Sequence, residues 1–245
     1  MASVALHTFS ALHTFTLERA PAPSPTARHV ERGRLAKHPP LSRLLRREPR
    51  VAQRLAGSTR MARAFFQGTL TAQTYAESLA RLYPVYATLE SVLASVGRDD
   101  RLNAFDLPDV FRARAILADL RYFGVAPEPI RPGASVAYFE HIRRLADESP
   151  TLLVAHAYVR YMVDLTGARI ARRLAQRVLQ LPSREGLAYL SFPAIAKADG
   201  FREDFRRRLD AFPRDRAEAL GIVGEATIAC ALDRELASEL WDERR

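Results

Sequence analysis

Apolar residues recur three and four positions apart along most of the chain from Leu41 onward, which is the spacing of an amphipathic helix. After Thr71, a capping residue, this spacing places Tyr75, Leu79 and Leu82 on one face. The same periodicity predicts helices over residues 70–96, 110–122, 136–148, 152–181, 199–212 and 214–240. No persuasive run alternates as a strand would. The sequence therefore predicts an all-α fold with a long helix, residues 152–181, crossing its middle.

The first 40 residues differ from the rest of the chain. Five prolines, at positions 21, 23, 25, 39 and 40, stand there among Arg, Ser and Ala. Such a composition has little apolar surface to bury and few backbone donors for regular structure. We predict a mobile Pro/Arg-rich N-terminal extension over residues 1–40 and one helical domain over residues 41–245.

Composition narrows the class of protein. Hydrophobic residues make up 48% and charged residues 27% of the 245 residues, which excludes wholesale disorder, collagen-like repeats and disulfide scaffolds. The one cysteine, Cys230, cannot form an internal disulfide, which fits a reducing cytoplasm. No apolar stretch reaches the ~18 to 20 residues that cross a bilayer. We therefore expect a cytoplasmic protein without a membrane span.

The chain is basic, with 37 Lys and Arg against 28 Asp and Glu and a net charge of +9. This balance favours anionic partners without choosing among them. The basic stretch from Arg28 to Arg50 could neutralise phosphates, but no aromatic stacking platform or groove-reading motif accompanies it. Nucleic-acid binding is therefore a weaker interpretation than a solvated extension.

The segment LLVAHAYVRYMVDLTGARIARRLAQRVLQL, residues 152–181, resembles the distal helix of haem oxygenases, whose pattern is approximately AHAYxRYLGDLSGGQ. Residues 62–90, 184–195 and 201–209 resemble further segments of that family in the same order. The resemblance covers roughly residues 41–240. It implies a single all-α domain that clamps haem (iron protoporphyrin IX) between a proximal and a distal helix and opens the macrocycle to biliverdin, carbon monoxide and iron. Haem is then both cofactor and substrate.

The resemblance implies a catalytic group on the distal side. Asp164 lies where the family has the carboxylate that orders a distal water, and Tyr86 lies where a family tyrosine joins this network. Arg160 stands four residues before Asp164, so in a regular helix the two side chains can form an ion pair. Such a carboxylate would deliver protons to the reacting oxygen through water.

The haem face of the distal helix matches the family only in part. Gly167 matches a glycine that lets this helix bend closely over the porphyrin, which would account for a glycine that costs roughly 1 kcal/mol relative to alanine inside a helix. Val163 stands where the family usually has glycine, and its branched side chain would intrude on the haem face. Ala168 replaces a second glycine with a smaller intrusion.

The propionate site is the best preserved. Arg46 falls at the position of the family's N-terminal lysine, Arg202 and Arg206 match a basic pair, and Tyr158 is nearby on the distal helix. Guanidinium groups bind carboxylates through bidentate, charge-assisted hydrogen bonds, so three arginines suit a dianionic macrocycle.

The proximal side departs from the family pattern. Gln53 stands where the axial histidine is expected, Gly57 replaces the carboxylate one turn later, and Pro49 interrupts the expected helix. The metal ligand would then be the amide oxygen of Gln53, or a water. His156, in the AHAY motif, is favoured as a satisfied core histidine, and His141 carries no usable context.

Two functions remain open. The first is a haem oxygenase with unusual ligation that receives electrons from an acidic donor, such as a ferredoxin or flavin reductase, docked on the basic face. The alternative is a non-catalytic protein that binds haem, another porphyrin or a bilin, which the loss of the proximal histidine would favour. Haemin titration followed by an assay for biliverdin separates the two.

Overall fold

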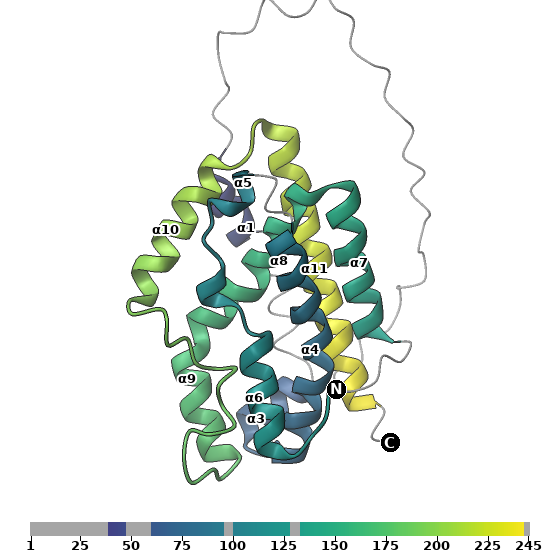
Figure 1. The fold of residues 1–245 in the computed structure, drawn as a ribbon, viewed down its shortest axis with the longest axis vertical. Helices are drawn as coiled ribbons and strands as arrows, with labels where there is room; N and C mark the ends of the chain where they lie inside the picture. The colour runs from purple at the N-terminus through teal and green to yellow at the C-terminus, as the bar shows by residue number, and fades with distance from the viewer. Residues whose placement is uncertain (1–38, 48–59, 96–99, 128–132, 243–245) are drawn as a thin grey trace, which may run out of the picture. The chain divides into compact units, whose positions relative to one another are not determined.

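The computed structural model describes residues 39–47, 60–95, 100–127 and 133–242. Within these ranges every regular element is helical, which confirms the all-α prediction (Figure 1). Nearly all of the predicted extension over residues 1–40 lies outside them. The elements are α1 (Leu41–Arg47), α3 (Arg60–Gln67), α4 (Ala72–Ser95), α5 (Asp100–Asn103), η2 (Pro108–Val110), α6 (Ala113–Phe123), α7 (Ala134–Glu148), η3 (Pro150–Leu152), α8 (Leu153–Ala157), η4 (Tyr158–Met162), α9 (Val163–Val178), α10 (Ala198–Ala211) and α11 (Arg216–Asp242).

Helix α4 begins where the sequence predicts it to begin. The hydroxyl of Thr71 accepts a hydrogen bond from the backbone N–H of Thr74 at 3.1 Å, which satisfies one of the free donors of the first turn. The face that carries Leu79, Val85 and Leu89 is fully buried. This face packs against α6 and α7, so α4 forms much of the core of the domain.

Helix α6 begins three residues later than predicted. Residues Pro108–Val110 form a separate 3₁₀ turn, and the carboxylate of Glu90 accepts the backbone N–H groups of Arg112 and of Ala113, the latter at 3.0 Å. A side chain from another helix therefore caps α6. The helix ends at Gly124, which takes the left-handed conformation at φ 66° that a residue without Cβ adopts readily.

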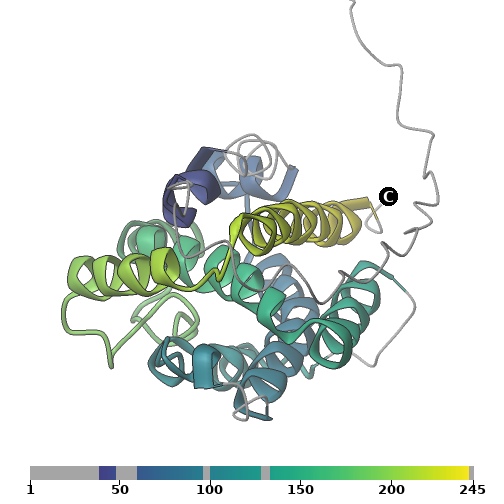
Figure 2. The same ribbon diagram turned by 90° about the horizontal axis from the view of Figure 1, so that it is seen from above.

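The terminal helix α11 joins the two sides of the domain. Figure 2 shows α1 and α3 on one side of α11 and α7 and α8 on the other, and α11 packs against all four. Buried Ile222, Ala226 and Ala229 lie along this helix, so small and apolar side chains allow close approach. Among the described helices, none is long and apolar enough to cross a membrane.

The predicted long helix is present but irregular. Residues 153–178 run without a break through α8, the π-helical turn η4 and α9, and residues 150–152 form a 3₁₀ turn before them. The irregularity comes before Gly167, the residue at which the sequence suggested a bend. A π-helical turn inside an α-helix is rare and is frequently found at functional sites. We call residues 153–178 the distal segment.

Candidate functional site

The distal segment carries a carboxylate at the start of α9. Asp164 lies in the first turn of that helix, directly after the π-helical turn. Both of its oxygens receive hydrogen bonds from tyrosine hydroxyls. Tyr86 donates to Oδ2, and the hydroxyl of Tyr189 lies 3.3 Å from each carboxylate oxygen. The two hydroxyls are 3.1 Å apart, so Asp164, Tyr86 and Tyr189 form one connected group, here called the distal network.

The two tyrosines come from opposite directions. Tyr86 is fully buried on α4, within the face that packs on the core. Tyr189 lies in the connection between α9 and α10, and buried Asp119 of α6 holds its backbone. The Asp119 carboxylate accepts the N–H groups of Ala188 and Tyr189, each at 2.7 Å. The position of the Tyr189 hydroxyl is therefore set by a carboxylate on another helix.

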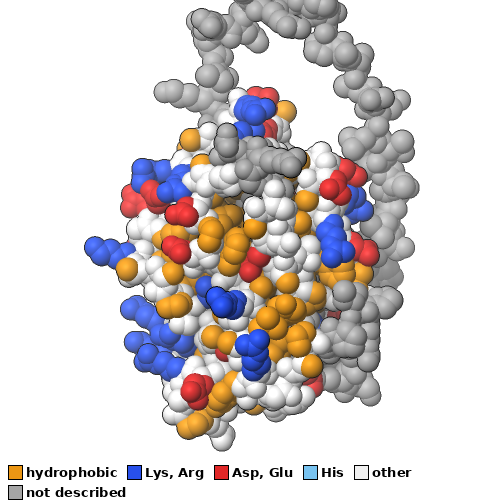
Figure 3. Space-filling model, viewed as in Figure 1, with side chains coloured by type: hydrophobic (Ala, Val, Ile, Leu, Met, Phe, Trp, Pro, Cys, Tyr) orange, Lys and Arg blue, Asp and Glu red, His pale blue; other side chains and the backbone are white. Residues whose placement is uncertain are grey.

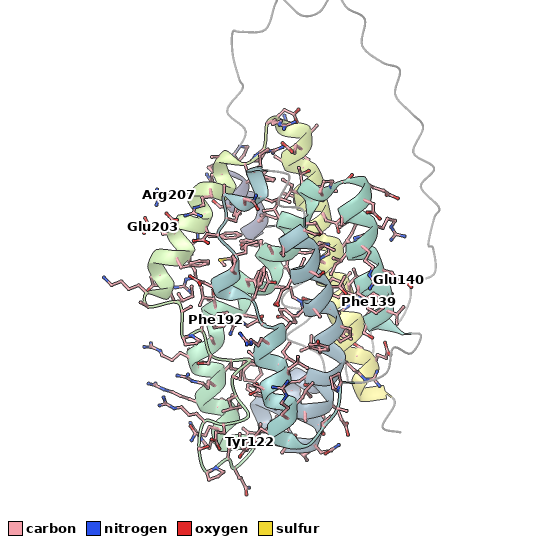
Figure 4. The ribbon with its side chains drawn as sticks, viewed as in Figure 1. Tyr122, Phe139, Glu140, Phe192, Glu203 and Arg207 are labelled. Carbon is pink, nitrogen blue, oxygen red and sulfur yellow. The ribbon has the colours of Figure 1, made fainter. Side chains whose placement is uncertain are left out.

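The connection that carries Tyr189 is held against α6 at a second point. Phe192, labelled in Figure 4, stacks under the guanidinium of Arg112, with 3.9 Å between the guanidinium carbon and the ring centroid. Arg112 also donates to the carbonyl of Ser191, and Arg172 of α9 donates to the Ser191 hydroxyl at 3.0 Å. Cation–π and charge-assisted contacts of this kind restrict the connection on both sides of Tyr189.

Arg160 has a different partner from the one that the sequence predicts. Its Nη2 lies 3.0 Å from Asp233 Oδ1 on α11, and its guanidinium faces the ring of Tyr86 with 4.9 Å to the centroid. The expected i,i+4 ion pair with Asp164 is therefore corrected to a pair with Asp233. The reason is local, because Arg160 lies in the π-helical turn, where the regular α-helical alignment of side chains is lost.

Burial sets the protonation of the distal network. It raises the pKa of the Asp164 carboxyl, and the charge of Arg160 and the hydrogen bonds from Tyr86 and Tyr189 only partly oppose this. Burial also raises the pKa of both tyrosines, so their hydroxyls keep their protons and remain donors. A carboxyl whose pKa is shifted toward neutrality can hold a proton and give it up again, which is the property of a general acid.

The arginines predicted for the propionates lie partly within the described residues. Arg202 of α10 pairs with Asp199, while its buried Nε has no hydrogen-bond partner in the described part of the chain. Arg206 is exposed on the same helix. Tyr158 is partly buried, with its ring centroid 6.5 Å from that of Phe205. Arg202 therefore keeps one buried donor without a partner among the described residues.

Space is open beside Gly167. A Cβ atom added there would meet no described atom within 4 Å, so packing among the described residues does not require glycine at this position. The backbone of Val163 lies in the first turn of α9, but its side chain is outside what the structure describes. The intrusion predicted for that valine stays a prediction.

The proximal side falls largely outside the described residues. Arg46 lies in α1, whose backbone alone is described at that position, and Gln53 lies in the gap between α1 and α3. Helix α1 is fixed to α10 through Ser42, whose N–H and hydroxyl donate to the carboxylate of Asp210 at 2.7 and 2.9 Å. The predicted ligand at Gln53 therefore stays a prediction.

Sequence reasoning missed three residues of this region. Tyr189 and Asp119 are far apart in the sequence and meet only in the fold, although the segment LAYLSFPAI had been matched to the family. Asp233 lies on α11, outside every segment that carries the resemblance. A buried arginine requires a nearby anion, and this requirement was the only signal in the sequence that pointed to Asp233.

Comparisons with known proteins agree with this geometry. The family model described as "Heme oxygenase" matches residues 39–239. A heme oxygenase of Guillardia theta is 30% identical over 189 residues, which cover 76% of this chain and 80% of the relative.

Two solved structures share the fold. The heme oxygenase of Leptospira interrogans has a TM-score of 0.78 at 32% identity, covering 82% of this chain and 100% of the other. Heme oxygenase-1 of the cyanobacterium Synechocystis, solved in complex with heme, has a TM-score of 0.78 at 28% identity, covering 84% and 94%. The family model spans more than half of the sequence, and the chain belongs to the haem oxygenase family.

Proposed function

We propose that this protein binds haem against the distal segment and opens it oxidatively to biliverdin, carbon monoxide and iron. The observation that carries the proposal is the distal network, in which a carboxylate with a raised pKa is held on the distal segment by two protonated hydroxyls. Membership of the family supports the ligand, since a relative with the same fold was solved in complex with heme. Haem is thus proposed as both substrate and cofactor.

The described residues fit such a ligand. The open space beside Gly167 leaves room for a flat ring against α9, because a side chain there would have projected into it. The guanidinium of Arg202, whose Nε has no hydrogen-bond partner among the described residues, and the exposed guanidinium of Arg206 offer cations for two propionates. Arg46 and Tyr158 are proposed as further contacts. Val163 is proposed to line the same face.

Bound haem supplies the redox-active iron and the ring that is oxidised. The chain contributes proton control. Asp164 holds a proton at its carboxyl and passes it to a water in the haem pocket, while Tyr86 and Tyr189 keep the carboxyl oriented. Arg160 acts on this network through Tyr86, and its pairing with Asp233 keeps a buried positive charge compensated.

On the proximal side, the amide oxygen of Gln53, or a water in its place, would hold the haem iron. An amide oxygen is a weaker and harder ligand than an imidazole. This departure from the family pattern is what would favour the alternative of a non-catalytic haem, porphyrin or bilin carrier.

Electron supply requires a partner. The exposed side chains of Arg169, Arg173 and Arg177 follow one another at i,i+4 spacing along α9, and Figure 3 shows Lys and Arg side chains gathered at that edge of the domain. We propose that an acidic redox protein, a ferredoxin or a flavin reductase, docks on this basic face. Buried and unpaired Cys230 is consistent with the reducing cytoplasm that we propose as its compartment.

Haemin titration of the purified chain tests the proposal. We expect a saturable Soret shift, followed by the absorption of biliverdin once oxygen and an electron donor are added. Saturable binding without any bilin would show that the carrier alternative is correct, and the absence of a Soret shift would remove both.

Two arginine variants test the ligand geometry. Arg202→Ala should weaken haemin binding about tenfold, because one charge-assisted hydrogen bond contributes about 1.5 kcal/mol. Arg207→Ala is the matched control on the same helix, since that side chain projects outward and is 73% exposed (Figure 4). Equal loss in both variants would mean that α10 contributes only general positive charge.

A further inference from the structure

A second buried polar cluster contains none of the residues of the distal network. His141 of α7, His156 of α8 and Glu225 of α11 converge where these three helices pack against one another. One potential ligand atom of each residue lies within 4.8 Å of the others. His156 is fully buried, Glu225 is 5% exposed, and His141 is partly buried. None of the three takes part in the haem chemistry proposed above.

The two imidazoles point at the same carboxylate oxygen. Nε2 of His141 lies 2.6 Å from Oε1 of Glu225, and Nε2 of His156 lies 2.8 Å from the same atom. Around a tetrahedral zinc ion with ligand bonds of ~2.0 to 2.1 Å, neighbouring ligand atoms stand about 3.3 Å apart. Lengthening these two contacts by about 0.7 and 0.5 Å would therefore open this cluster to an ion.

The three residues offer the kinds of ligand atom that zinc binds. His141 and His156 each present an imidazole nitrogen, and Glu225 presents a carboxylate oxygen, all within 4.8 Å of one another.

The residues that hydrogen-bond to the two histidines can adapt to a bound ion. The hydroxyl of Tyr138 lies 3.4 Å from Nδ1 of His156, and a hydroxyl either donates or accepts. When an ion takes the place of the proton on Nε2 of His156, the ring carries its proton on Nδ1 instead, and Tyr138 then accepts a hydrogen bond from Nδ1. Arg144 donates to Nδ1 of His141 at 3.1 Å, and its exposed side chain is free to turn toward water.

We propose that His141, His156 and Glu225 form a binding site for one divalent first-row transition-metal ion, with zinc as its simplest occupant. Two histidines and a glutamate are a known ligand set for zinc, with water completing the tetrahedron. The side chain of His141 is 16% exposed and marks where the ion and its water enter. The bound ion joins α7, α8 and α11, and the site goes beyond the proposed haem function.

Zinc binding to the full-length, haem-free protein tests this site. We expect equilibrium dialysis with elemental analysis to find one tightly held zinc ion per chain. His141→Ala should weaken that binding at least tenfold, since even residues that only orient ligands change metal affinity by about 10- to 100-fold. Glu140→Gln is the matched control, because Glu140 neighbours His141 on α7 and is exposed (Figure 4).

The chain has six histidines, so the comparison of variants decides the result. Equal affinity and stoichiometry in wild type and His141→Ala would place the zinc elsewhere and overturn the proposal, as would the absence of tight binding in wild type. Far-UV circular dichroism confirms that the variant is folded. Thermal denaturation gives a second reading, because zinc should raise the Tm of wild type and of Glu140→Gln but not that of His141→Ala.

Discussion

The distal segment carries residues of two buried polar clusters, and their carboxylates behave in opposite ways. Asp164 has a raised pKa, whereas the pKa of Glu225 is lowered to about 2. Burial pushes both values upward. The difference lies in the partners, because Asp164 receives hydrogen bonds from two phenols and Glu225 receives them from two imidazoles.

This difference shows what a hydroxyl and an imidazole each do for a buried anion. A phenol with a raised pKa donates a hydrogen bond but brings no charge, so it only partly compensates the lost hydration of the carboxylate. Two imidazole N–H groups meet on one oxygen of Glu225, and their hydrogen bonds outweigh the effect of burial, so this carboxylate stays ionised. With two phenols as partners, Asp164 keeps a proton that can be exchanged. With two imidazoles as partners, Glu225 stays an anion that can hold neighbouring helices together or bind a cation.

The largest effect that we predict comes from removing the exchangeable proton. Asp164→Asn should lower the rate of biliverdin formation about 10²- to 10⁴-fold, the usual contribution of a positioned general acid. Haemin affinity should change little, because Asp164 is not among the proposed propionate contacts. Stopped-flow absorption under single-turnover conditions measures the rate, and an unchanged rate would remove Asp164 from the mechanism.

Asp164→Asn also tests the direction of the Asp164 pKa shift, through the stability of the haem-free protein. A group whose folded pKa is raised stabilises the fold below its unfolded pKa, and this stability is lost as pH rises through the folded value. At pH 7 the Asp164 carboxyl therefore opposes folding. Asp164→Asn should leave the free energy of unfolding equal or higher at that pH, and a clear decrease would contradict the direction of the pKa shift.

In the cluster of His141, His156 and Glu225, we expect removal of the carboxylate charge to lower the free energy of unfolding. Glu225→Gln should lower the free energy of unfolding at pH 7 by about 3 kcal/mol, because two imidazole N–H groups lose a charged acceptor at about 1.5 kcal/mol each. Urea denaturation measures the difference. A loss below 1 kcal/mol would show that the imidazoles find other partners.

At acid pH the difference in stability between wild type and Glu225→Gln should disappear. The lowered pKa of Glu225 contributes stability above its unfolded value of 4.5, and this contribution is lost as pH falls toward about 2. The gap between wild type and Glu225→Gln should therefore narrow steadily between those two values. The stability of wild type relative to Asp164→Asn should instead decrease as pH rises, because the raised pKa of Asp164 contributes stability at low pH that is lost at higher pH.

A smaller effect tests the tyrosine that the sequence did not reveal. Tyr189→Phe removes one donor to Asp164 and should destabilise the fold by about 1 kcal/mol, the net value of a hydrogen bond. It should also raise the pKa of Asp164 further and shift the pH profile of single turnover upward. Tyr122→Phe is the control, since that residue is 40% exposed, and a matching shift there would contradict a role for the distal network.

The smallest effect concerns Gly167. Gly167→Ala should stabilise the haem-free protein by about 0.5 to 1 kcal/mol, because alanine favours the helix and the added Cβ meets no atom of the described residues within 4 Å. The same Cβ should weaken haemin binding if the ring lies against α9. Stability and affinity should thus move in opposite directions, and unchanged affinity would place the ligand elsewhere.

The sequence predicts most of the fold because helical periodicity is a local property. The helices around Leu79 and Ile142 were predicted in type and in approximate bounds, and Thr71 caps the helix that it was expected to begin. The late start of α6 was not predicted, because it depends on a carboxylate from Glu90, 23 residues away from Ala113.

For the site as well, the sequence predicts what local segments determine and misses what depends on packing between helices. Asp164 and Tyr86 were predicted because they lie in segments that resemble the family, and His156 was correctly expected to be a satisfied core histidine. The partner of Arg160 was predicted wrongly, since i,i+4 pairing presumes a regular helix. The convergence of His141 with His156 and Glu225 depends on how three helices pack, which no local pattern in the sequence specifies.

The π-helical turn has a consequence for aligning this chain with others. A turn closed by i→i+5 hydrogen bonds takes up one residue more than an α-helical turn, and one residue corresponds to about 100° of rotation. A helical wheel drawn continuously from Leu153 to Val178 therefore places the side chains of α9 about 100° away from their actual direction around the helix axis. By the same reasoning, deletion of a single residue within 158–162 would preserve the orientation of Asp164 relative to His156, whereas deletion within α9 would turn every later side chain away from its present neighbours.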